Sequence, residues 1–117
     1  MPARVLVVDD DEEIRSALTE LLVDEGYETL GAANGQQALA LLHETAVDVV
    51  LLDLMMPVMN GWQLLASLRA DARLSRVPVI VMTAGSRGEQ VEAQGFLRKP
   101  LDVSALFSTV EQAAHAA

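Results

Sequence analysis

Two adjacent aspartates, Asp9 and Asp10, follow the apolar run RVLVV at residues 4–8 and call for a chemical explanation. The third aspartate of this acidic run, Asp11, is explained as the N-cap of a following helix, because its carboxylate can accept hydrogen bonds from free backbone amides. Two glutamates, at residues 12–13, then lie in the first helical turn, where the positive end of the helix dipole favours acidic side chains. Neither role accounts for Asp9 and Asp10, so these two are candidates for a functional site.

Three further polar residues follow apolar runs later in the chain: Asp53, Thr83 and Lys99, the only lysine. If the three carboxylates meet, their repulsion requires either proton uptake or a bound cation. Oxygen-only ligands favour Mg²⁺, with Mn²⁺ as the alternative. A carboxylate beside such a cation can attack phosphorus and form an aspartyl phosphate. Lys99 and Thr83 would then offer a positive charge and a hydroxyl donor to the phosphoryl group, so Asp53 is the expected nucleophile.

Short β-rich runs alternate with helical patterns, and this alternation predicts the elements that position the polar residues. Strands are expected over residues 4–8, 27–33, 47–53, 77–83 and 95–99. Five such units predict an α/β fold: a doubly wound, five-stranded parallel sheet of flavodoxin-like type, with order 2-1-3-4-5 and helices on both faces. Strands one and three are neighbours in this order, and ligands bind beyond their carboxyl ends. Asp9, Asp10 and Asp53 are therefore expected to meet there.

Single residues predict several helix boundaries. Gly26 is expected to stop the first helix, and Asn60 and Asp102 are expected to cap two later ones. These positions divide the chain into compact units without a long linker.

The composition limits the class of protein. A chain of 117 residues is expected to form a single domain over residues 1–117, large enough for a core without disulfides. There are no cysteines, which excludes a thiolate metal site and fits a cytoplasmic location. The formal net charge of −9 argues against direct binding to nucleic acid or to anionic membranes. We find no apolar segment with the length of a signal peptide or a membrane span.

Four segments, in this order, resemble the receiver domain of a two-component response regulator (CheY-like): VLVVDDDEEIR, VVLLDLMMPVMNG, VIVMTA and FLRKPLD. The resemblance covers essentially the whole chain. It implies that Asp53 accepts a phosphoryl group from a phosphohistidine, carried by a histidine kinase or a histidine phosphotransfer protein. It also implies that Mg²⁺ is held by Asp53, directly by Asp10, partly through water by Asp9, and by the backbone carbonyl of Met55. The signal would pass by protein contacts to a downstream target or an output domain.

The same resemblance assigns the remaining roles. Thr83 and the backbone of Ala84 would bind the phosphoryl group together with Lys99. Phe96 would move with Thr83 when the domain switches between two states. The bond between Lys99 and Pro100 would be cis. Such a domain is not expected to be an enzyme, because it catalyses only its own phosphorylation and dephosphorylation.

One segment departs from the family's pattern. Only 16 positions separate Thr83 from Lys99, which leaves residues 84–94 for the crossover between the last two strands. We therefore expect a shortened fourth helix of about two turns, roughly over residues 87–94, or a partly irregular segment there. This shortening puts the family's usual output face in question.

Two alternatives are weighed against this interpretation. The pair Asp9 and Asp11 resembles the opening motif of haloacid-dehalogenase-like phosphohydrolases, in which Asp9 would be the nucleophile and Asp11 the acid/base. That motif requires a threonine where this chain has Glu13, and it leaves Asp53 without a role. The other alternative is a receiver-like interaction module that is never phosphorylated.

Overall fold

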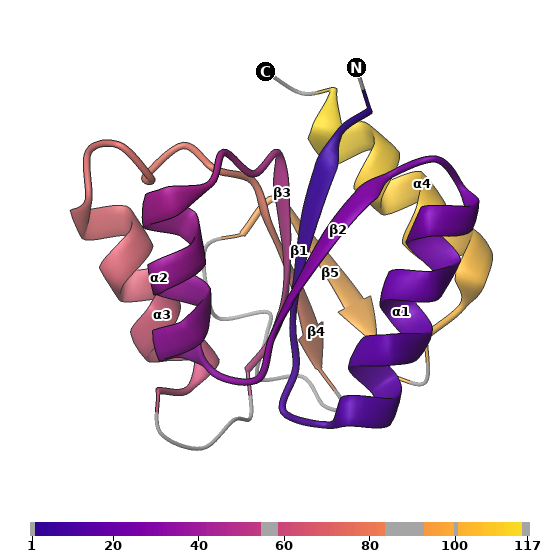
Figure 1. Cartoon of the computed structure of the whole chain (residues 1–117), viewed down its shortest axis with the longest axis horizontal. Helices are drawn as coiled ribbons and strands as arrows, with labels where there is room; N and C mark the ends of the chain where they lie inside the picture. Colours follow the sequence, from indigo (N-terminus) through magenta and orange to yellow (C-terminus); the bar gives the residue numbers. More distant parts are fainter. Residues whose placement is uncertain (1, 55–58, 84–92, 100, 116–117) are drawn as a thin grey trace.

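A parallel sheet of five strands forms the centre of the molecule. The structure, a computed structural model, describes residues 2–54, 59–83, 93–99 and 101–115. The strand order is β2-β1-β3-β4-β5 (Figure 1). The strands are β1 (Arg4–Val8), β2 (Glu28–Ala32), β3 (Val49–Asp53), β4 (Val79–Thr83) and β5 (Gly95–Arg98). This is the predicted order, so the doubly wound fold is confirmed and β1 and β3 are neighbours at the point where the order reverses.

Burial along the sheet follows the position of each strand. Every residue of β3 is buried, as expected for a central strand covered on both faces. The edge strand β2 is only partly buried. Two predicted strands, 47–53 and 77–83, begin two residues too early. Asp48 instead accepts a hydrogen bond from the Arg4 amide on Oδ2, at 2.7 Å, and Pro78 has no N–H with which to extend the ladder.

Four helices lie in the described part of the chain, and their boundaries follow the predicted capping residues. They are α1 (Glu12–Asp24), α2 (Gly35–Glu44), α3 (Gly61–Ala70) and α4 (Val103–Ala114). The side chains of Asp11, Asn60 and Asp102 each accept a backbone N–H at a helix start, as predicted. Gly26 follows α1 with a φ of 96°, a left-handed conformation that glycine adopts without strain.

The sheet separates two hydrophobic cores. Helices α2 and α3 cover one face, and α1 and α4 cover the other (Figure 1). Leu6 and Val8 of β1 point into the first core, whereas Val5 and Val7 point into the second. The same alternation runs along β3. A shift of one residue in the pairing of β3 would therefore turn Asp53, at the end of this strand, toward the opposite face. No helix in the described part of the chain combines the length and apolar character needed to cross a bilayer.

The structure differs from the sequence-based prediction at the end of the helix expected over residues 87–94. Ala93 and Gln94 are not helical. Gln94 instead begins the pairing of β5 with β4: its amide donates to the Val79 carbonyl at 2.9 Å, and its Oε1 accepts the Val79 amide at 2.8 Å. The prediction that the helix reaches Gln94 is therefore wrong, and the rest of this segment lies outside the described residues.

Candidate functional site

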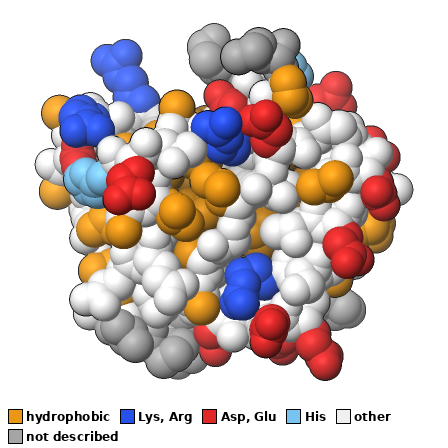
Figure 2. Space-filling view, viewed as in Figure 1, with side chains coloured by type: hydrophobic (Ala, Val, Ile, Leu, Met, Phe, Trp, Pro, Cys, Tyr) orange, Lys and Arg blue, Asp and Glu red, His pale blue; other side chains and the backbone are white. Residues whose placement is uncertain are grey.

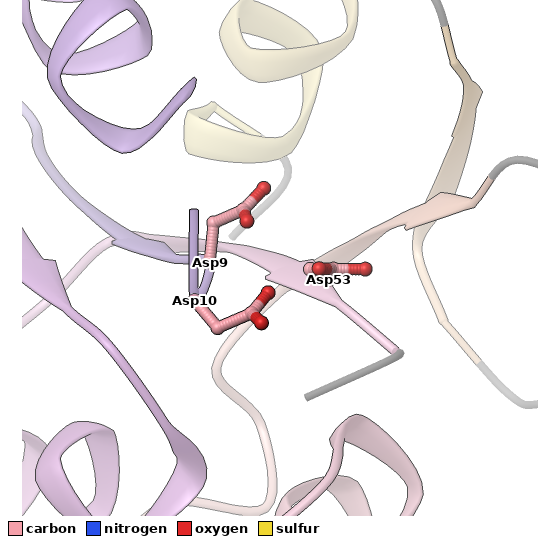
Figure 3. A group of neighbouring side chains, drawn as sticks. All are labelled: Asp9, Asp10 and Asp53. Carbon is pink, nitrogen blue, oxygen red and sulfur yellow. The ribbon is translucent and has the colours of Figure 1, made fainter. Parts of the chain in front are cut away.

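Three carboxylates meet at the carboxyl ends of β1 and β3, as the sequence predicts. Asp9 and Asp10 follow β1 directly, and Asp53 is the last residue of β3. Each of the three offers an oxygen within 4.8 Å of the others (Figure 3). Asp9 is completely buried and Asp53 is 6% exposed, whereas Asp10 is exposed. Two buried carboxylates beside a third form a strongly negative site.

The alternation of the strands explains why these side chains converge. Val5 and Val7 point toward the core beneath α1 and α4, and Asp9 continues that series. On β3, Asp53 continues the series of Val49 and Leu51 toward the same face. The pairing of Val5 with Val49 and Val7 with Leu51 places the two series side by side, so both carboxylates reach the same edge.

Lys99 reaches the same site from the end of β5. Its Nζ lies 3.3 Å from Oδ2 of Asp9 and 3.7 Å from Oδ2 of Asp53. The lysine amide donates to the Thr83 carbonyl at 2.8 Å, which fixes its backbone beside the end of β4. With its side chain 23% exposed, Lys99 compensates part of the negative charge of the two buried aspartates. Among the described residues, the ion pairs of this site set one lysine against three carboxylates.

The acidic run at the start of α1 divides as the sequence predicts. Oδ1 of Asp11 accepts the amides of Glu13 and Ile14 at 2.9 and 3.2 Å, so this carboxylate caps the helix. The Asp9 carboxylate faces the site, and its Oδ1 accepts the Asp11 amide at 3.0 Å. The carboxylate of Asp11 therefore has a structural role, and of this acidic run Asp9 and Asp10 belong to the site.

Thr83 and Phe96 lie on the neighbouring strands β4 and β5. Thr83 ends β4 and pairs with Arg98, two residues beyond the pair formed by Val81 and Phe96. Residues two apart on a strand share a face, so Thr83 and Phe96 lie on the same side of the sheet. Thr83 is half-buried, and Phe96 is 41% exposed.

Three other predicted positions, Met55, Ala84 and Pro100, lie outside the described residues. The carbonyl, backbone and cis-bond roles expected of them stay predictions.

One residue of the site was missed by the sequence analysis. Arg15, in the first turn of α1, donates from Nη1 to the carbonyl oxygen of Asp9 at 2.7 Å. A positive side chain at a helix N-terminus opposes the helix dipole. That mismatch is the signal by which Arg15 could have been singled out.

The carboxyl edge can thus hold a hard divalent cation between carboxylates, with a lysine that contacts both Asp9 and Asp53. These are the parts that a phosphoryl transfer to a carboxylate requires. Comparison with known proteins points the same way.

The family described as "Response regulator receiver domain" matches residues 5–111. Protein PilH of Pseudomonas aeruginosa is 37% identical over 114 residues, which are 92% of this chain and 94% of PilH. The probable transcriptional regulator ycf29 of Pyropia yezoensis is 34% identical over 116 residues, and the chain spans only about half (52%) of its length. The chemotaxis response regulator CheY4 of Vibrio cholerae superimposes with a TM-score of 0.89 at 33% identity, over 97% of this chain and 99% of CheY4.

Proposed function

Because the chain belongs to the response regulator receiver domain family, we propose that Asp53 is its phosphoacceptor and that residues 1–117 act as a single receiver domain. One observation carries this proposal. The Asp53 carboxylate lies beside the two other aspartates and within reach of Lys99, whose Nζ is 3.7 Å from its Oδ2 and 3.3 Å from Oδ2 of Asp9. A carboxylate that adjoins both a cation site and a positively charged lysine suits attack on a phosphoryl group.

In the proposed step, a carboxylate oxygen of Asp53 forms a bond to phosphorus. The phosphorus–nitrogen bond of a phosphohistidine breaks, and the imidazole leaves with the electron pair and takes up a proton from water. Lys99 lies where its charge can hold a phosphoryl oxygen, and Thr83, at the end of the next strand, supplies a hydroxyl donor. The backbone of Ala84 is proposed to assist Thr83.

A divalent cation fits the residues at this edge. Asp9 and Asp53 are buried, Asp10 is exposed, and their oxygens lie within 4.8 Å of one another. Lys99 compensates only part of their charge, and all donors are oxygens, which suits Mg²⁺ or Mn²⁺. Asp9, Asp10, Asp53 and the Met55 carbonyl would hold the cation. When bound, it supplies positive charge that neutralises the oxygens of the incoming phosphoryl group.

Phosphorylation would act as a switch rather than as a turnover reaction. The new charge on Asp53 would draw Thr83 toward it, and Phe96, on the same face of the neighbouring strand, would repack with it. A coupling of about 1–3 kcal/mol between the two states is enough for signalling. The bond between Lys99 and Pro100 is proposed to be cis.

The partners follow from this chemistry. The donor would be a histidine kinase or a histidine phosphotransfer protein, and the signal would pass by protein contacts to a downstream protein or an output domain. We place this exchange in the cytoplasm. The domain would catalyse only its own phosphorylation and dephosphorylation.

Two contacts argue against a phosphohydrolase that uses Asp9 and Asp11. The Asp9 carboxylate is completely buried and engaged by the Asp11 amide and by Lys99. The Asp11 carboxylate caps α1, so it does not face a substrate as an acid/base. With Asp53 as the nucleophile, Asp9 can keep its contacts and Asp11 can remain the N-cap of α1.

Mass spectrometry after incubation with acetyl phosphate tests the proposal. We expect a phosphoryl adduct on Asp53 that requires Mg²⁺ and is absent from Asp53→Asn. Asp48→Asn, which alters a carboxylate at the opposite end of the sheet, is the matched control and should keep the adduct.

An adduct on Asp9 would support the hydrolase. If neither acetyl phosphate nor a phosphohistidine donor modifies Asp53, the proposal is wrong and the domain acts as an unphosphorylated interaction module.

A further inference from the structure

Arg15 makes a contact that its place in the helix does not explain. It lies in the first turn of α1, where its amide donates to the Asp11 carbonyl, and a positive charge is unfavourable there. Its half-buried side chain turns back toward the sheet, and Nη1 donates to the carbonyl oxygen of Asp9 at 2.7 Å. A charged donor at this distance makes a strong hydrogen bond.

We propose that Arg15 is a positioning residue for the cation site: it holds the backbone between Asp9 and Asp10, and Gly31 provides the space through which it reaches. This inference rests on the proposed function, because it assigns a role toward the cation that Asp9, Asp10 and Asp53 would hold.

The Asp9 carbonyl controls the direction in which Asp10 leaves the strand. This oxygen belongs to the planar peptide group that joins Asp9 to Asp10, so a bond to it fixes the whole plane. Other contacts fix Asp9 itself: its amide donates to the Ala32 carbonyl at 3.1 Å, and its carboxylate is engaged as described above. Asp10 has no such support, since its side chain has no hydrogen bond or ion pair in the described part of the chain. Its position therefore depends on the backbone that Arg15 holds.

Gly31 explains how the arginine reaches this carbonyl. It lies on β2 opposite Val7 of β1, at a strand position where glycine is unfavourable. A Cβ at Gly31 would lie 3.3 Å from Cδ and 3.5 Å from Cγ of Arg15. The aliphatic part of the arginine thus passes over the glycine, and any larger residue would press against it.

The main test compares two arginines that make the same kind of bond. Arg69 on α3 is also half-buried and also donates from Nη1 to a carbonyl six residues away, that of Ser75, at 2.8 Å. Mg²⁺ affinity is measured calorimetrically on the unphosphorylated full chain. We expect Arg15→Met to weaken Mg²⁺ binding roughly tenfold, as loss of an outer-shell contact typically does. Arg69→Met should leave the affinity unchanged.

The direction of the change separates positioning from simple electrostatics. Removing a positive charge near three carboxylates would by itself favour a cation, so a purely electrostatic role predicts tighter Mg²⁺ binding in Arg15→Met. Positioning predicts weaker binding. Arg15→Lys keeps the charge on a shorter side chain and should restore part of the affinity.

The Gly31→Ala variant tests the path of the side chain. Its methyl group should displace Arg15 and weaken Mg²⁺ binding by a smaller factor than Arg15→Met. In a chain that already carries Arg15→Met, the same glycine change should have no further effect, because the two residues act through one contact.

Each outcome distinguishes this inference from the proposed function. If the unaltered chain binds no Mg²⁺ and acquires no adduct on Asp53, the proposed function fails. If it binds Mg²⁺ but Arg15→Met binds equally well or more tightly, or Arg69→Met loses as much affinity, the positioning role is wrong. Should Arg15→Met not fold, Arg15→Lys and Gly31→Ala decide by the same criterion.

Discussion

The parallel strands begin at one end of the sheet, the amino edge, and finish at the other, the carboxyl edge. These two ends carry similar charged residues but arrange them in opposite ways. At the amino edge, Arg4 pairs with Glu28 at 3.0 Å, and His43 lies 3.6 Å from Asp71. These contacts match one basic group with one acidic group, and each includes a largely exposed side chain. At the carboxyl edge, one lysine faces two buried aspartates, and a third aspartate lies beside them.

This difference distinguishes exposed charges, which keep the surface solvated, from the buried charges of a functional site. Exposed one-to-one pairs contribute about 0–1 kcal/mol and leave no net demand for a ligand. Buried carboxylates in excess oppose folding, since their charge is poorly solvated and they repel one another. Figure 2 shows further acidic side chains over α1, which contains Glu12, Glu13, Glu20 and Asp24. Those are solvated, so the cost is concentrated at the buried cluster.

Lys99→Ala is expected to have the largest effect on stability. It leaves Asp9 and Asp53 buried without their shared partner and, because Lys99 is partly exposed, should lower the free energy of unfolding by about 2 kcal/mol, below the range for a fully buried pair. Mg²⁺ should restore much of this loss, since a cation that binds only the folded state stabilises it. Urea unfolding with and without Mg²⁺ measures both effects.

Arg4→Met is the control at the amino edge. It removes an exposed pair and should cost less than about 1 kcal/mol, with no response to Mg²⁺. Equal losses in the two variants, or a loss in Lys99→Ala that Mg²⁺ leaves unchanged, would remove the distinction between the edges.

The polar cluster could be predicted from the sequence because a simple rule places it. Apolar runs give the strands, the right-handed crossover limits their order, and the carboxyl ends of neighbouring parallel strands then converge. Asp53 and Lys99 are 46 residues apart in the chain, yet Asp53 ends β3 and Lys99 directly follows β5. Their meeting therefore needs no knowledge of individual side-chain conformations.

The contact between Arg15 and the Asp9 carbonyl could not be predicted in that way. It depends on the path of one flexible side chain over Gly31, on a third element. No periodicity encodes such a path. The same holds for Gln94, whose side chain accepts the Val79 amide just before β5, at a position where the end of a helix was expected.

Asp10→Asn should have a smaller effect on stability, in the opposite direction. Asp10 is the exposed member of the cluster, and removing its charge relieves repulsion from two carboxylates. Without divalent cations, the free energy of unfolding should rise by about 0.5–1 kcal/mol. Mg²⁺ binding should weaken by more than about tenfold, because a ligand is lost. Thermal unfolding and calorimetry measure the two changes on one sample.

Asp71→Asn gives the matched control at the amino edge. It removes the partner of His43 and should change stability by no more than about 0.5 kcal/mol, without altering Mg²⁺ affinity. If Asp10→Asn destabilises the cation-free protein, the carboxylates are not in net repulsion and the contrast between the edges has another cause.

The smallest expected effect concerns Tyr27, next to the start of β2 at the amino edge. Burial raises the pKa of its phenol above the ordinary 10.0, and the charges of Glu111 and Glu25 raise it further. The folded state thus disfavours the phenolate. Its stability is unaffected below pH 10 and falls as the pH rises above that value, because the unfolded chain then loses the proton first.

Tyr27 is the only tyrosine, so its phenolate absorbance can be followed without overlap from another tyrosine. Glu111→Gln should lower its pKa only part of the way toward 10.0, since burial is the larger cause. Glu44→Gln, which removes a carboxylate from α2 on the opposite face of the sheet, should leave it unchanged. A Tyr27 pKa at or below 10.0 would mean that the amino edge is solvated enough to ionise freely. The carboxyl edge would then be the only one of the two where burial opposes charge.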